Sequence, residues 1–93
     1  MKKFVIEREV PGIGGLSEEE TSGAAKTSNE ALDQLAPKVQ WIHSYVTAGK
    51  TFCIYLAEDE DAIRKHSELS GFPANTITEV IRIIDPTTAN RPY

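Results

Sequence analysis

A short connection between two apolar segments in the middle of the chain constrains its fold most. Residues 39–47 and residues 51–57 both have the composition of β-strands, and only the three residues AGK separate them. A connection of this length joins neighbouring antiparallel strands. The segments before and after this hairpin must therefore pack around a central antiparallel pair.

One strand and one helix are predicted before the hairpin. Residues 3–10 alternate between apolar and polar side chains, which indicates a strand with Phe4 and Ile6 on its core face. A turn cluster, PGIGG, follows. Ser17 then begins a capping-box pattern, which predicts the start of a helix. This helix should end before Pro37, because the residue before a proline disfavours helical backbone angles.

A helix, a strand and a tail are predicted after the hairpin. Asp59 is placed to cap the start of the second helix, and Gly71 is placed to end it. Residues 76–85 have the composition of a fourth strand. Residues 86–93 contain two prolines and show no periodicity, so we expect an extended C-terminal tail.

The order strand, helix, strand, strand, helix, strand predicts the ferredoxin-like βαββαβ fold of the α+β class. The domain would span residues 1–85, with residues 86–93 as its tail. Right-handed crossovers place the first strand between the third and fourth in a four-stranded antiparallel sheet, with the second strand at an edge. Both helices then cover one face of the sheet. The other face stays open, which on a chain of 93 residues predicts a homodimer interface or a pocket.

The register of the hairpin decides which side chains reach the open face. A three-residue loop would pair His43 with Tyr55, whereas a two-residue loop would shift the pairing by one residue. We expect the three-residue loop, because it makes one face almost wholly aliphatic, as packing under helices requires. The helices would then cover Ile42, Ser44, Val46, Phe52, Ile54 and Leu56, and the open face would carry Glu7, Trp41, His43, Tyr45, Cys53 and Tyr55.

Two histidines make a metal site one hypothesis for the chemistry of this chain. Imidazole binds divalent metals and titrates near neutrality. The candidate metal ligands are His43, His66 and Glu7. A structural role is open for each of them: both histidines could be packed boundary residues, and Glu7 could form an ion pair with Arg82.

The alternative hypothesis is an enzyme that uses a pocket on the open face. A carboxylate, an imidazole and two phenols on an otherwise apolar sheet are the groups that general acid–base catalysis needs. The candidate catalytic residues are Glu7, His43, Tyr45 and Tyr55, acting on a small-molecule ligand.

The composition disfavours several other classes of protein. A formal net charge of −4 argues against a nucleic-acid binder and against an anionic membrane surface as partner. One cysteine cannot form an internal disulfide, which predicts a cytoplasmic location. No apolar run approaches the roughly 18 residues of a membrane span, and the first residues do not form a signal peptide. The glycines after the first strand do not complete a dinucleotide-binding fingerprint.

Several segments resemble a small bacterial family of unknown function that is built on a ferredoxin-like domain. The matching runs include FVIEREVPG at 4–12, QWIHSYV at 40–46, FCIYLAED at 52–59 and GFPAN at 71–75. A member of that family is described as a nickel-binding protein. The resemblance implies a homodimer that binds nickel or another divalent transition metal.

A wider resemblance is to dimeric α/β-barrel proteins, in which two such sheets pack face to face and enclose a pocket. That architecture hosts small isomerases and cofactor-free oxygenases, which gives the enzyme hypothesis its form. We favour metal binding by a small cytoplasmic homodimer over catalysis.

Overall fold

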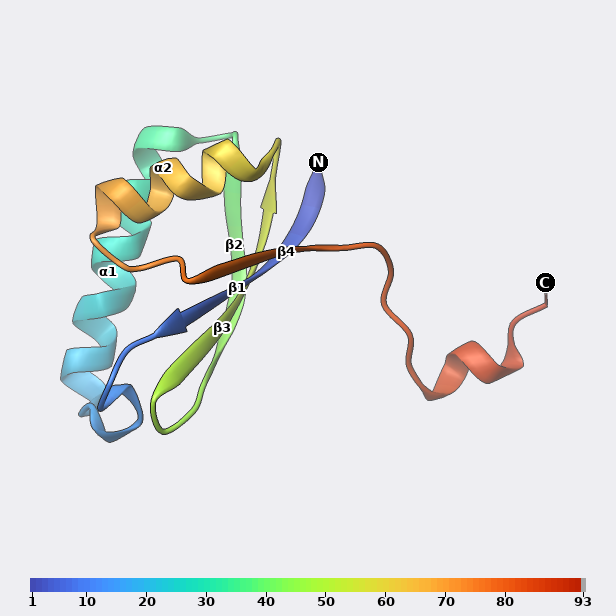
Figure 1. Ribbon diagram of the computed structural model, residues 1–93, viewed down its shortest axis with the longest axis horizontal. Helices are drawn as coiled ribbons and strands as arrows, with labels where there is room; N and C mark the ends of the chain where they lie inside the picture. The colour runs from blue at the N-terminus through green and yellow to red at the C-terminus, as the bar shows by residue number, and fades with distance from the viewer. Residues whose placement is uncertain (93) are drawn as a thin grey trace.

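The computed structural model describes residues 1–92 and shows a four-stranded sheet with both helices on one face (Figure 1). The strand order is β2-β3-β1-β4, and every neighbouring pair is antiparallel. The prediction of a ferredoxin-like α+β fold is therefore confirmed. The elements are β1 (Lys2–Glu9), η1 (Ile13–Gly15), α1 (Glu18–Leu35), β2 (Val39–Val46), β3 (Lys50–Ala57), α2 (Glu60–Ser70), β4 (Thr76–Val80) and η2 (Pro86–Asn90).

Both helices begin at the predicted capping residues, α1 ends before Pro37 as expected, and α2 ends at the predicted glycine. The Ser17 hydroxyl accepts a hydrogen bond from the Glu20 N–H at 3.1 Å, and the Glu20 carboxylate accepts one from the Ser17 N–H at 3.1 Å. The Asp59 carboxylate caps α2, and Gly71 ends that helix with a left-handed φ of 79°. These caps provide hydrogen-bond partners for backbone groups at the helix ends that have no partner within the helix. Residues close together in the sequence therefore set these helix ends.

The predicted register of the β2–β3 hairpin was wrong. Val46 pairs with Thr51, and the Thr47 N–H donates to the Lys50 carbonyl at 2.8 Å, so only Ala48 and Gly49 form the loop. The register also shifts between Trp41 and His43, where Ile42 is the extra residue of a bulge. The bulge places Trp41 beside Tyr55 and leaves His43 beside Ile54.

The predicted faces of β3 were consequently wrong as well. Phe4 and Ile6 of β1 pair with Tyr55 and Cys53, and all four side chains are buried under the helices. Trp41 lies on this helix-covered side too, packed against the core. Both sets of alternating residues in β3 are apolar, so composition alone did not identify the inner one. The face without helices, called the open face below, carries Val5, Glu7, His43, Tyr45, Phe52, Ile54 and Leu56.

The fourth strand is shorter than predicted, because it ends at Val80 rather than at Asp85. Val80 pairs with Lys3, near the first residue of β1, so the chain beyond it has no neighbouring strand. Residues 81–92, called the C-terminal arm below, extend away from the sheet on the side opposite the helices (Figure 1). The radius of gyration, 14.5 Å, accordingly exceeds the roughly 12 Å of a compact chain of this length.

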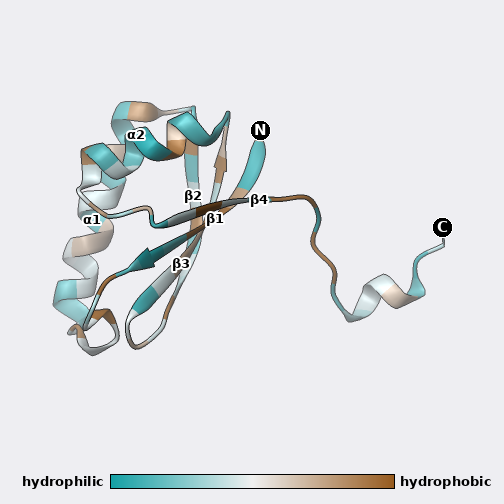
Figure 2. Ribbon diagram, in the orientation of Figure 1, coloured by the Kyte–Doolittle hydropathy of each residue, from teal (hydrophilic) through white to brown (hydrophobic). Residues whose placement is uncertain are grey.

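The arm is apolar where it leaves the sheet, as the colouring of Figure 2 shows. Its isoleucines, Ile81, Ile83 and Ile84, are 77%, 63% and 73% exposed. Within the predicted tail, η2 is a short 3-10 helix that the Asp85 carboxylate caps by accepting from the Thr87 N–H at 2.8 Å. Tyr93 lies outside the described residues, and the domain boundary at residue 85 stays a prediction.

Candidate functional site

Three of the predicted site residues lie on the open face. The His43 Nε2 atom is 3.2 Å from the Tyr45 hydroxyl, and both side chains are exposed. Glu7 lies two strands away, because β3 separates β1 from β2 by about 10 Å in total. Its carboxylate is 3.9 Å from Lys50 Nζ, and this ion pair takes the place of the predicted pair with Arg82. The structure thus brings His43 to Tyr45 but does not join either of them to Glu7.

The other two predicted site residues are buried on the opposite side of the sheet. Tyr55 lies under the helices, and its ring centroid is 5.2 Å from that of His66. His66 is on the inner face of α2 with no exposed surface, and its Nε2 atom is 3.1 Å from the Ser28 hydroxyl. Because the sheet lies between the two groups, a pocket or metal site shared by all the predicted residues of one chain is not favoured.

Burial changes the acidity of both inner residues. Desolvation, with a smaller contribution from the nearby Arg8 charge, lowers the pKa of His66 to about 4. Desolvation raises the pKa of Tyr55, and the positive charge of Arg8 partly opposes that rise. At neutral pH these two groups are therefore an uncharged imidazole and an uncharged phenol beside a positive guanidinium.

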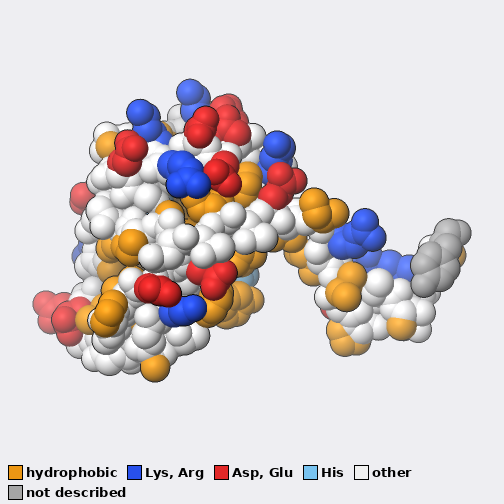
Figure 3. Space-filling view, viewed as in Figure 1, with side chains coloured by type: hydrophobic (Ala, Val, Ile, Leu, Met, Phe, Trp, Pro, Cys, Tyr) orange, Lys and Arg blue, Asp and Glu red, His pale blue; other side chains and the backbone are white. Residues whose placement is uncertain are grey.

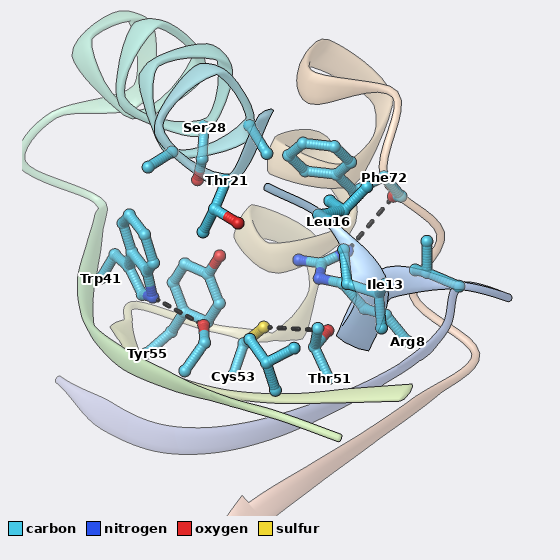
Figure 4. A pocket seen from close by; sticks show the side chains of 15 residues that line it. Arg8, Ile13, Leu16, Thr21, Ser28, Trp41, Thr51, Cys53, Tyr55 and Phe72 are labelled. Atoms are coloured by element: carbon cyan, nitrogen blue, oxygen red, sulfur yellow. Dashed lines mark hydrogen bonds between the residues drawn. The ribbon is translucent and has the colours of Figure 1, made fainter. Parts of the chain in front are cut away.

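A cavity that the sequence reasoning missed lies between α1 and the helix-covered side of the sheet (Figure 4). Its volume is about 140 Å³. Apolar side chains form most of its wall, and Arg8, Tyr55 and Thr21 bring polar groups to it. The signal for Arg8 was present in the sequence: Arg8 shares strand parity with Phe4 and Ile6, so it had to point inward with them.

The Arg8 guanidinium is held by the last turn of α2 and by the chain that follows it. Its Nη1 atom donates to the carbonyl oxygens of Pro73 at 2.6 Å and Phe72 at 3.2 Å, and to the Ser67 hydroxyl at 3.2 Å. The side chain is buried, and its Nη2 atom has no hydrogen-bond partner. These contacts fix the direction of the guanidinium and leave one of its nitrogens free to bind another group.

Two other polar groups in the wall form hydrogen bonds within their own strands and do not point into the cavity. The Trp41 indole N–H donates to the Ser44 hydroxyl at 3.0 Å, and the Cys53 thiol donates to the Thr51 hydroxyl at 3.5 Å. These bonds direct the polar atoms along the strands. The wall that β2 and β3 present is therefore mainly apolar.

The glycine-rich loop after β1 closes one end of the cavity with Ile13 and Leu16. The Gly14 N–H donates to the Ala48 carbonyl at 3.3 Å, which fastens this loop to the β2–β3 turn. A Cβ atom at Gly14 would lie 2.7 Å from the Thr47 carbonyl oxygen, so a larger residue cannot take this place without a backbone shift. The close approach explains why the loop needs glycine there.

Charged side chains gather over α2 in Figure 3, whereas the arm carries apolar side chains together with basic ones. None of the helices among residues 1–92 is long and apolar enough to span a lipid bilayer.

Comparisons with known proteins agree with this architecture. The chain resembles the crystal structure of SCO4226 from Streptomyces coelicolor A3(2), with a TM-score of 0.72 and 18% sequence identity. The likeness covers 88% of this chain and 99% of that one, and it shows the fold. A comparison with curated proteins returns no match. A family model described as "Nickel responsive protein SCO4226-like" matches residues 4–80, from β1 to the end of β4. The chain therefore belongs to the SCO4226-like family.

Proposed function

We propose that this protein is a homodimer that binds nickel or a similar divalent transition metal, with His43 as its imidazole ligand. The description of the family as nickel responsive supports the choice of metal. The observation that carries the assignment is the position of His43, which is exposed on the open face, whereas His66 is fully buried. Imidazole suits nickel, copper and zinc, so the donor chemistry agrees with this group of metals.

One chain supplies only part of a coordination sphere. Within residues 1–92, no group of three or more His, Cys, Asp or Glu side chains comes together at one point. The Tyr45 hydroxyl lies 3.2 Å from the Nε2 atom of His43. Since protein metal sites are built from several side chains, we propose that a second copy of the chain supplies further ligands across the open face.

Two features support the homodimer. The open face is apolar at its centre, where Val5, Phe52, Ile54 and Leu56 are only partly buried, and Tyr45 at its edge is 59% exposed. Uncovered apolar surfaces of this kind mark interaction sites in small proteins. The C-terminal arm, with its exposed isoleucines, leaves the domain on the same side (Figure 1). Face-to-face packing of two copies would bury both surfaces.

Nickel titration by isothermal calorimetry tests the metal proposal. His43→Ala should weaken nickel binding by at least about tenfold, because it removes the imidazole ligand. His66→Gln is the matched control and should leave the affinity unchanged. Acidification should weaken binding in the parent protein, since the ligand must be neutral. Equal nickel affinity in the parent and in His43→Ala would refute the role of His43.

Light scattering tests the homodimer separately. The parent protein should have about twice the chain mass of 10.3 kDa. Ile54→Lys, which places a charge at the centre of the open face, should give a monomer, whereas Glu30→Lys on the exposed side of α1 should not. A monomeric parent at micromolar concentration would refute the proposal.

A further inference from the structure

A buried arginine presents a free donor to the cavity between α1 and the sheet. Arg8 is 3% exposed, and none of the ion pairs among residues 1–92 includes it. Its Nη1 atom is bonded to protein oxygens, and its Nη2 atom is unpaired. A guanidinium stays charged in proteins, and a buried charge is costly unless an opposite charge or good acceptors surround it. The geometry therefore favours an anionic group beside Nη2.

The other polar groups of the cavity point to the same space. Figure 4 shows the Tyr55 and Thr21 hydroxyls directed toward the region that the Arg8 guanidinium faces. The centre of the Tyr55 ring is 6.0 Å from the central carbon of that guanidinium. A hydroxyl donor and a guanidinium donor that face the same space can bind the two oxygens of one carboxylate.

The rest of the wall fits an apolar body of limited size. Ile13, Leu16, Val46 and Phe72 line the cavity from three different segments. Its volume of about 140 Å³ is close to that of the engineered apolar cavity, about 150 Å³, that holds benzene. Apolar walls with a few convergent polar groups are typical of small-molecule sites.

We propose that this cavity binds a small carboxylate whose apolar body is about the size of a benzene ring. The carboxylate accepts from Arg8 Nη2 and the Tyr55 hydroxyl, and the apolar body packs against Trp41 and the residues of α1. The sheet separates this site from His43, so the site does not depend on the proposed metal function.

Benzoate is the probe that tests this inference, and Trp41 is the reporter. Trp41 is the single tryptophan of the chain and lines the cavity, so its fluorescence should change saturably when benzoate binds. Cyclohexanecarboxylate should bind with similar affinity. Benzyl alcohol, which has the ring without the charge, should bind at least about tenfold more weakly, because it makes no charge-assisted hydrogen bond.

Variants locate the binding. Arg8→Met keeps a long apolar side chain and should remove the preference for benzoate over benzyl alcohol. Ala25→Leu should fill the cavity from α1 and abolish binding of both probes, whereas Glu30→Leu on the exposed side of the same helix should not. If Arg8→Met does not fold, the comparison of the two probes and the Ala25→Leu variant still decide.

Three results would overturn the inference. The first is the absence of a saturable response at about 1 mM benzoate, the concentration at which a binding free energy of about 4 kcal/mol gives half-saturation. The second is an equal affinity for benzoate and benzyl alcohol. The third is unchanged benzoate binding in Ala25→Leu. Benzoate affinity should be the same in His43→Ala as in the parent, which separates this site from the proposed metal ligand.

Discussion

Lowering the pH from about 7 to about 5 should destabilise this protein through His66. The pKa of this ring is about 4 in the folded protein, because burial and the Arg8 charge both disfavour its protonation. In the unfolded chain the pKa returns to about 6.5. The unfolded state therefore binds a proton first as the pH falls. The contribution of neutral His66 to the free energy of unfolding is fully present above a pH of about 6.5 and is lost as the pH falls from there toward 4.

The expected size follows from the difference between the two pKa values. The full shift corresponds to roughly 3 kcal/mol of the free energy of unfolding, and about 2 kcal/mol of it should be lost by pH 5. For a domain of this size that loss lowers the melting temperature by roughly 8–16 °C. The groups that face His66 are the positive Arg8, the neutral phenol of Tyr55 and the Ser28 hydroxyl, and none of them supplies a negative charge to stabilise an imidazolium.

Urea unfolding at the two pH values, at one fixed protein concentration, measures this loss. His66→Gln keeps a hydrogen-bonding group near Ser28 but has no proton to gain, so its loss should be smaller by about 2 kcal/mol. His43→Gln, at an exposed position, should behave like the parent. Equal losses in the parent and in His66→Gln would refute the reasoning. So would an NMR titration in which the His66 ring of the folded parent is protonated at pH 6.

Two further predictions concern the walls of the cavity. Gly14→Ala should lower the free energy of unfolding by about 1–3 kcal/mol in denaturant titrations, because its Cβ atom meets the Thr47 carbonyl at 2.7 Å. The control is Gly15→Ala, whose Cβ atom meets nothing within 4 Å and which should not be destabilising. Equal effects of the two substitutions would contradict the close-approach argument. An alkaline absorbance titration should show one tyrosine that ionises later than a free phenol, because burial raises the pKa of Tyr55, and Tyr55→Phe should remove that late step; an unchanged titration curve would contradict the assignment.

Local signals in the sequence were enough to predict the elements and their order. The Ser17 and Asp59 caps and the Gly71 stop act within a few residues of the chain, so they can be recognised without the tertiary structure. The order of elements and the handedness of crossovers then leave few arrangements of a four-stranded sheet. These two facts explain why the strand order was predicted correctly.

The faces of β3 could not be predicted in the same way, because both are apolar. Phe52 and Ile54 are as suitable for a core as Cys53 and Tyr55, and the choice depends on the pairing of β3 with β1. The Ile42 bulge added a second difficulty, because it changes the parity of β2 within the strand. A bulge depends on tertiary contacts, and no residue of this stretch indicates one from the sequence alone.

The candidate site was predicted only in part for the same reason. His43 and Tyr45 were expected together, and their side chains are neighbours on the open face. The contribution of Arg8 was missed because only Phe4 and Ile6 were assigned to the core face of β1, although the same parity places Arg8 beside them. The exposure of the arm was missed because Ile81, Ile83 and Ile84 have strand-like composition, and composition does not show that β1 has ended.

A single layer of strands separates the cavity from the open face, and this has a consequence for any mutational scan of β2. Ser44 lines the cavity, while its neighbours His43 and Tyr45 lie on the other side. Beyond the Ile42 bulge, substitutions at residues 43–46 should therefore fall alternately into two groups of phenotypes, one for ligand affinity and one for self-association or metal uptake. Within this segment, residues adjacent in the chain would then tolerate independent change, whereas residues two apart would not.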